Sequence, residues 1–319
     1  MSDYVFECES GAYGFLKMDG DKLLIVINDG FMKSFNEYQD SFKRLSEYEA
    51  RSRDTLDWLT LTHPIGRLLS ISLWFKSQPN RQVKRIIENY SAGGFYVRST
   101  RGQQYLPNDN SMPIYSTDSK LDEIRSFNSI SNYLSTLFDY VEPESSNLST
   151  YSNKIRESLI LACSEVEYLF KKFLNDNNYS GPQRLSTNDF VKISPHLKLK
   201  DYTVKLKQFP SLGVFAPFAS WNDAQPTASL NWYDAYNAVK HDRGGNKNRG
   251  DLEMLINSIA AIHILLEAQY GEHIFDAPMR SKHESIFVTE TLPIWDIADY
   301  AMPNLGTPTA WTHKLAIHF

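Results

Sequence analysis

Cysteine is scarce in this 319-residue sequence, which contains only Cys8 and Cys163. Two thiols this far apart in the chain form neither a CxxC redox pair nor a Cys/His zinc cluster by their spacing. The eight histidines show no HExxH pattern, so the common zinc-hydrolase motif is excluded as well. We therefore expect this protein to use neither a metal nor a cofactor.

A net positive charge and long apolar runs are also lacking. The formal net charge is −5, so a nucleic acid would have to be bound by a local basic patch rather than by the whole surface. The patterns GxxxxGK[ST] and GxGxxG are absent from the sequence, which excludes the common nucleotide-phosphate loops. The chain starts without a basic-then-apolar leader, and no run approaches about eighteen apolar residues. We expect a cytoplasmic protein that makes no contact with a membrane.

Core-forming residues, in contrast, are plentiful. Hydrophobic residues make up 42% and aromatic residues 13% of the chain, enough for one large or two ordinary domains. Residues 1–115 are predicted to form an α+β module. Asp19-Gly20-Asp21 between two apolar runs predicts a β-hairpin. The patterns of 31–59 and 79–90 predict helices, and FYVRS (95–99) predicts a strand.

Residues 116–271 are predicted to be mainly helical. Four segments each carry one apolar stripe at helical spacing, over residues 119–141, 153–173, 230–241 and 251–270. Four helices of this kind are expected to pack as an up-and-down four-helix bundle. Gly250 or Asp251 is expected to cap the last of them. Residues 175–227 are too many for a plain loop and are predicted to form an insertion. Residues 272–319 are predicted to be an irregular tail with one strand, SIFVT.

The most unusual stretch is NWYDAYNAVKHDRGGNKNRG, residues 231–250. On a helix, Asn237 and His241 share one face because they lie four residues apart. The end of this helix and the glycine-rich segment after it are basic, with Lys240, Arg243, Lys247 and Arg249 against Asp242. Such a segment beside His241 is suited to holding a phosphate.

The stretches SLILACSEVEYLFKKFL, WYDAYNAVKHDR and DLEMLINSIAAIHILLEAQY resemble the HEPN superfamily of small helical-bundle domains, over roughly residues 120–270. The family motif is an Arg followed after four to six residues by His, often with Asn directly after the Arg. In members that cleave RNA, two domains dimerise so that their motifs line a metal-free RNase site. The resemblance implies a HEPN-like bundle, a homodimer, and an RNA-binding endoribonuclease that acts as a toxin or phage-defence effector.

Carried over to this sequence, the motif assigns His241 to the family His and Asn237 to the polar residue after the Arg. Tyr236 stands in the Arg position, and Arg243 is the guanidinium expected to take its place. His241 would serve as acid or base when a ribose 2′-OH attacks the adjacent phosphate. Arg243 and Lys240 would hold the phosphate charge, with Asn237 as an orienting partner. Lys247, Arg249 and Tyr236 complete the expected substrate-binding surface.

The alternative is a non-catalytic dimerisation or interaction module. In this interpretation Asn237 and His241 form a buried, hydrogen-bonded structural pair at one end of the bundle. Tyr236 in place of the Arg favours this alternative, whereas the basic segment from Lys240 to Arg249 favours RNA.

Three further features have a structural and a functional interpretation. The segment Lys192–Lys207 holds five lysines and could guide single-stranded RNA, but an edge strand protected by lysines explains it better. Glu167 is expected to pair with Lys171 one turn further along a helix. His263 lies in an apolar helix and is expected to be a core histidine with satisfied hydrogen bonds.

Overall fold

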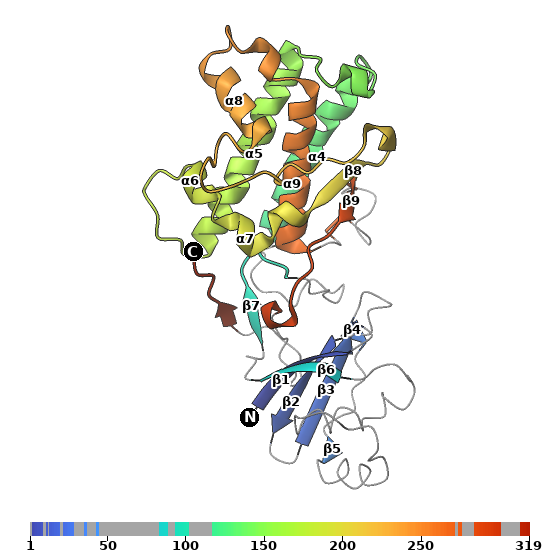
Figure 1. Cartoon of the computed structure of the whole chain (residues 1–319), viewed down its shortest axis with the longest axis vertical. Helices are drawn as coiled ribbons and strands as arrows, with labels where there is room; N and C mark the ends of the chain where they lie inside the picture. The colour runs from blue at the N-terminus through green and yellow to red at the C-terminus, as the bar shows by residue number, and fades with distance from the viewer. Residues whose placement is uncertain are drawn as a thin grey trace. The chain divides into compact units, whose positions relative to one another are not determined.

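The protein is described here by a computed structural model (Figure 1), which covers residues 2–8, 11, 13–19, 22–28, 35–36, 43–44, 83–88, 93–101, 117–271, 274–275, 284–300 and 313–319. The chain forms two compact units. We call residues 1–95, 101–113 and 295–315 the sheet unit, and residues 96–100, 114–294 and 316–319 the helical unit. Small sheets together with helices that lie mostly in the C-terminal half make this a mixed α+β fold.

The sheet unit is built on an antiparallel sheet in the order β4-β3-β2-β1-β6, with β5 also paired to β3. Its strands are β1 (Ser2–Cys8), β2 (Tyr13–Asp19), β3 (Lys22–Asn28), β4 (Phe35–Asn36), β5 (Lys43–Arg44) and β6 (Val83–Glu88). β2 and β3 pair antiparallel with Asp19 opposite Lys22, which confirms the predicted β-hairpin. Val5 and Phe6 are both fully buried, although neighbouring residues of a strand point to opposite faces. The centre of the sheet is therefore covered on both sides.

Both helices predicted in the sheet unit are wrong where the structure describes them. The helix expected over 31–59 contains β4 and β5, and its other residues lie outside the described part of the chain. The helix expected over 79–90 is replaced by β6. Val83, Ile86 and Ile87 have helix-like spacing, but β6 pairs antiparallel with β1 along its length, and such pairing overrides a weak local preference.

The strand predicted from FYVRS is confirmed in part as β7 (Gly94–Tyr96), which pairs with β10 (His313–Leu315). A short 3-10 turn, Ile297–Asp299, follows Asp296, whose carboxylate accepts a hydrogen bond from the amide of Ala298 at 2.8 Å. Asp296 also pairs with Arg85 of β6 at 2.5 Å. A C-terminal segment is therefore joined to the N-terminal sheet by the ion pair between Asp296 and Arg85.

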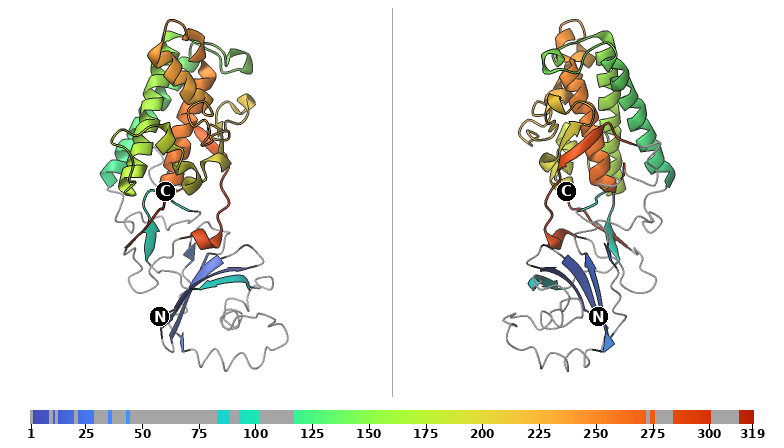
Figure 2. Two further views of the ribbon diagram at one scale, coloured as in Figure 1. Left: turned by 60° about the vertical axis from the view of Figure 1, so that its left-hand side comes forward. Right: turned by 90° about the vertical axis from the view of Figure 1, so that its right-hand side faces the viewer.

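The long helices of the helical unit lie close to their predicted positions, as α4 (Thr117–Phe138), α5 (Asn153–Asp176), α8 (Asn231–His241) and α9 (Leu252–Tyr270). Figures 1 and 2 show α4, α5 and α9 side by side, and α8 packs on α5 and α9. The hydroxyl of Ser152 accepts a hydrogen bond from the amide of Ile155 at 3.2 Å and so caps α5. Asp251 accepts from the amide of Met254 at 3.0 Å, which confirms the predicted cap of α9.

α9 is the core of the helical unit. Among the described helices it is the one long and apolar enough to cross a membrane, but 83% of that stretch is buried inside the protein. Burial of this kind is typical of the core helix of a soluble domain, because most of its surface packs on neighbouring elements.

The insertion between α5 and α8 is largely short elements: α6 (Thr187–Phe190), α7 (Ile193–Leu197), two 3-10 turns and β8 (Thr203–Leu206). β8 pairs with β9 (Phe287–Thr291), which is the strand predicted from SIFVT. Lys205 pairs with Glu290 at 3.0 Å and Lys207 with Glu284 at 3.2 Å. Lys205 and Lys207 therefore border a short edge strand, which confirms the structural interpretation for two of the five lysines of this segment.

Residues 96–100 are held in the helical unit by the buried side chain of Arg98, which is 2% exposed. Its guanidinium forms an ion pair with the buried carboxylate of Glu123 on α4 and another, at 2.8 Å, with Asp176 at the end of α5. It also donates to the side-chain oxygen of Gln269 on α9 at 2.5 Å. One arginine therefore contacts three helices.

A second buried polar cluster surrounds His263, which confirms the predicted core histidine. Nδ1 lies 2.8 Å from the hydroxyl of Ser285, and Nε2 lies 3.0 Å from the hydroxyl of Thr289. The Thr289 hydroxyl donates to the carboxylate of Glu267 at 2.5 Å, so it must accept from Nε2. This chain assigns the neutral tautomer with the proton on Nε2. Burial, with a smaller contribution from the charge of Lys207, lowers the pKa of His263 to about 3.

This cluster predicts a loss of stability in mild acid. Between about pH 6.5, the pKa of an unfolded histidine, and pH 3, the unfolded chain binds a proton at residue 263 that the folded chain rejects. The free energy of unfolding should then fall by about 1.4 kcal/mol for each pH unit below 6.5, or roughly 2 kcal/mol between pH 7 and pH 5. Urea titrations at several pH values measure this slope. His263→Gln, which removes the titrating group, should be less steep over the same range, and an equal slope would contradict the prediction.

Candidate functional site

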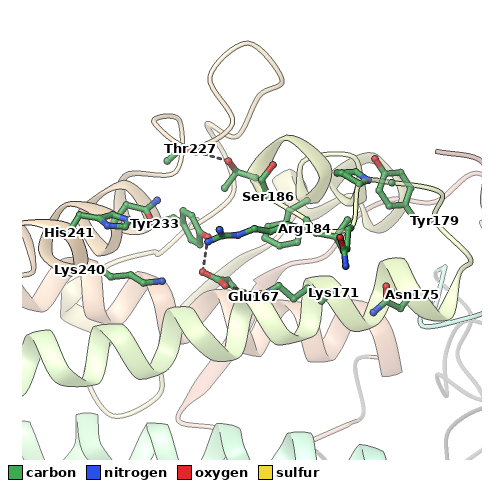
Figure 3. Close-up of a pocket in the computed structure, with 17 residues that line it drawn as sticks. Glu167, Lys171, Asn175, Tyr179, Arg184, Ser186, Thr227, Tyr233, Lys240 and His241 are labelled. Atoms are coloured by element: carbon green, nitrogen blue, oxygen red, sulfur yellow. Dashed lines mark hydrogen bonds and ion pairs between the residues drawn. The ribbon is translucent and has the colours of Figure 1, made fainter.

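A cleft of about 690 Å³ opens on the helical unit between α5, α8 and the segment that leads from α5 into α6. Figure 3 shows its lining. The charged residues and the histidine of the lining are Glu167 and Lys171 from α5, Arg184 from the connecting segment, and Lys240 and His241 from α8. Three cations thus share the cleft with one carboxylate, which favours an anionic ligand.

Helical periodicity places these side chains together. Glu167, Lys171 and Asn175 follow one another at intervals of four and form one face of α5. Asn237 and His241 have the same spacing on α8. The opposite face of α8 packs into the core through Trp232, Ala235 and Val239, each at most 2% exposed. Burial of that apolar face turns the polar face of α8 toward the cleft.

Glu167 is the centre of a hydrogen-bond network at the base of the cleft. Its Oε1 accepts from the hydroxyl groups of Tyr233 at 2.9 Å and Tyr236 at 3.2 Å. Its Oε2 forms the ion pair with Lys171 at 3.1 Å, which confirms the predicted pairing. Lys240 donates to the Tyr236 hydroxyl at 2.7 Å and lies over the Tyr236 ring, 4.8 Å from its centre. The carboxylate is therefore held by both helices.

This network fixes the protonation states around the cleft. Burial favours a protonated Glu167, but the Tyr233 hydroxyl and Lys171 outweigh it and lower the pKa of the carboxyl group. Burial and the nearby carboxylate raise the pKa of Tyr233. The hydrogen bond to Tyr236 raises the pKa of Lys240. At neutral pH the base of the cleft therefore holds an ionised carboxylate, neutral phenols and a charged lysine.

The connecting segment is tied down at both ends by Asp189, a buried residue of α6. The Tyr179 hydroxyl donates to Oδ1 of Asp189 at 2.9 Å, and the amide and hydroxyl of Ser186 lie 2.9 and 3.1 Å from Oδ2. The Ser186–Asp189 contacts form a capping box that starts α6. From this anchored segment Arg184 extends into the cleft (Figure 3).

The structure brings together some of the predicted site residues and separates the others. Asn237, Lys240 and His241 line the cleft, whereas Tyr236 is buried and bonds through its hydroxyl to the lining residues Glu167 and Lys240. Arg243, Lys247 and Arg249 are exposed on the segment after α8 and do not line the cleft. Arg249 instead pairs with Asp234 at 2.6 Å, and the backbone oxygen of Lys247 accepts from Arg156 at 3.3 Å.

Two specific expectations therefore need correction. Arg243 is exposed and does not line the cleft with His241, since the chain leaves α8 at Asp242, whose carboxylate accepts a hydrogen bond of 3.0 Å from the Gly245 amide. The buried Asn237–His241 pair is also not seen. His241 is exposed and Asn237 half-buried, and no hydrogen bond between their side chains is among the contacts of the described residues.

No pattern in the sequence predicts that Lys171 and Arg184 line this cleft. For Lys171, the sequence predicted only the ion pair with Glu167. Arg184 lies in the run GPQR, which has no periodicity to predict its direction. Within the described part of the chain, no three His, Cys, Asp or Glu side chains converge as a metal site would require.

Comparisons with known proteins find no match among family models, curated proteins or solved structures. The function of the cleft has to be argued from its own geometry and charge.

Proposed function

We propose that the helical unit is a HEPN-like four-helix bundle and that its cleft binds RNA and cleaves it without a metal. The observation that carries this proposal is the gathering of an exposed imidazole, His241, with Lys171, Arg184 and Lys240 in one open cleft. The one acid in the lining, Glu167, pairs with Lys171, and its single negative charge stands against three positive ones.

The reaction needs only groups that line the cleft. The imidazole of His241 takes the proton of a ribose 2′-OH, and the 2′-oxygen forms a bond to the adjacent phosphorus. The bond from phosphorus to the 5′-oxygen breaks, and that oxygen takes up the proton from His241. The products are a 2′,3′-cyclic phosphate and a free 5′-hydroxyl. Lys240 stabilises the charge on the phosphorane oxygens, and Asn237 is placed to hydrogen-bond the substrate or the imidazole.

Phosphate contacts also favour a single-stranded polyanion over a small neutral ligand. Lys171 and Lys240 lie on different helices, and a flexible backbone could reach both cations in one pass through the cleft. Binding of this kind is sequence-tolerant and sensitive to salt. In keeping with the HEPN resemblance, we propose that the protein works in the cytoplasm as a homodimer, as a toxin or a phage-defence effector.

A non-catalytic RNA-binding or interaction module is the second candidate. The observation that favours it concerns Tyr236, which stands at the motif Arg position. Its hydroxyl donates a hydrogen bond to Glu167 and accepts one from Lys240. In that case the cleft would hold a phosphate and leave it intact.

A cleavage assay separates the two candidates. In the presence of EDTA, purified protein should convert single-stranded RNA to fragments with 2′,3′-cyclic phosphate ends, and should leave DNA of the same sequence whole because DNA lacks the 2′-OH nucleophile. Fragment ends can be identified by mass spectrometry. RNA that is bound but not cut would support the second candidate as an RNA-binding module, and RNA that is neither bound nor cut would overturn the ribonuclease and leave only an interaction module that does not use RNA.

A further inference from the structure

The cleft lacks an arginine at the position where the family motif carries one, because Tyr236 stands there. A tyrosine hydroxyl cannot supply the fork of charged N–H donors that a guanidinium offers to a phosphate. We infer that Arg184, from the segment between α5 and α6, supplies this guanidinium and contacts the phosphate at the scissile position. This inference rests on the proposed function and names a residue that the motif does not contain.

The position of Arg184 supports this role. It lies among the lining residues together with Lys240 and His241, although 56 residues separate it from Lys240 in the sequence. Figure 3 shows its side chain reaching across the cleft toward Glu167 and Tyr233. The guanidinium thus enters from the wall opposite α8, and a phosphate between the two walls would meet charges on both sides.

The charge around Arg184 is also unbalanced. No hydrogen bond or ion pair of its side chain is among the contacts of the described residues, and the side chain is exposed. Its charge is close enough to Lys240 to oppose the rise in the pKa of that lysine. Glu167, the nearest carboxylate in the lining, is shared by Lys171 and two tyrosines. Glu167 also acts on Lys240, so one carboxylate faces three cations, and a bound anion would reduce the repulsion between Arg184 and Lys240.

Hydrogen bonds anchor the segment that carries Arg184 on both sides of this residue. Tyr179 before it and Ser186 after it both bond to the carboxylate of Asp189, so the ends of the segment are fixed to one point. Gly181 lies directly on the Tyr179 ring, where an added Cβ would approach a ring carbon within 2.3 Å. Such anchoring lowers the entropy lost when Arg184 binds a phosphate.

The experiment compares four proteins: wild type, Arg184→Ala, Arg184→Lys and Arg125→Ala. Arg125 is a matched control, an exposed arginine on α4 that pairs with Asp122 and does not line the cleft. Binding of a fluorescent single-stranded RNA is measured by polarisation over a range of salt concentrations, and cleavage of the same RNA is followed in EDTA. Circular dichroism of each variant checks that the fold is kept.

We expect Arg184→Ala to lower the slope of log affinity against log salt by about 0.7, the value for one lost phosphate contact on a single strand. It should also slow cleavage about 100-fold or more. Arg184→Lys should keep the salt slope but recover only part of the rate, because a lysine lacks the planar fork. Arg125→Ala should match wild type in both assays.

The outcomes separate this inference from the function on which it rests. If wild type binds and cleaves RNA and Arg184→Ala behaves like Arg125→Ala, Arg184 is not the phosphate-contacting residue and the proposed function stands. If wild type neither binds nor cleaves RNA, the proposed function is overturned and the inference with it. If Arg184→Ala loses affinity but Arg184→Lys restores both affinity and rate in full, a simple positive charge suffices and the guanidinium has no special role.

Discussion

Arg98→Ala should destabilise the helical unit by about 3–5 kcal/mol, the cost of breaking a buried ion pair from one side. The substitution would leave the carboxylate of Glu123 buried at 1% exposure without its cation. It would also remove one of the two ion pairs of Asp176, which keeps only Lys172 at 3.2 Å. Urea unfolding at pH 7, followed by the helical signal in circular dichroism, measures the change.

The control for this prediction is Arg125→Ala, which removes an exposed ion pair with Asp122. Surface pairs contribute about 0–1 kcal/mol, so this variant should unfold almost like wild type. The double change Arg98→Met with Glu123→Met should regain much of the loss, because it leaves no uncompensated charge at this site. A loss below 1 kcal/mol for Arg98→Ala would show that residues 96–100 are not held by this cluster.

His241→Ala should slow RNA cleavage by about 10²–10⁴-fold, the usual contribution of a general acid or base. The exposed imidazole makes no side-chain hydrogen bond among the described contacts, so its removal should change neither the melting temperature nor RNA affinity by much. Cleavage rates in EDTA, polarisation and thermal unfolding measure the three quantities.

His318→Ala is the matched control, since His318 is also exposed and belongs to the helical unit but does not line the cleft. Cleavage by His241→Ala at the wild-type rate would remove His241 from the mechanism. A lower melting temperature with unchanged RNA affinity and cleavage rate would show that His241 has a structural role instead.

The long helices of the helical unit could be predicted from sequence because local signals mark their apolar faces and their starts. In α5, the apolar residues Ile155, Leu159, Val166 and Phe170 recur on one face, and all are buried. Asp251 marks the start of α9 because its side chain is a good acceptor for a free amide. β6 could not be predicted in this way, since its pairing with β1 joins residues about eighty positions apart and local spacing carries no information on such a contact.

The candidate site was only half visible in the sequence for a similar reason. Asn237, Lys240 and His241 lie on one short helix, so their common face follows from helical spacing. Arg184 reaches the same cleft through the fold of the insertion, and Tyr233 and Tyr236 meet Glu167 only because α8 packs on α5. Arg98 is similar: no local pattern reveals that an arginine after a short strand will join three helices.

The path of the chain has a consequence for any attempt to divide the protein. The boundaries between the sheet unit and the helical unit fall at residues 95/96, 100/101, 113/114, 294/295 and 315/316. No single proteolytic cut can therefore release two complete units, because segments of the two units alternate along the sequence. A stop codon after residue 271 would delete Ser285 and Thr289, on which the hydrogen bonds of His263 depend. We expect stable fragments to be rare in limited proteolysis, and the gene to tolerate truncation poorly at either end.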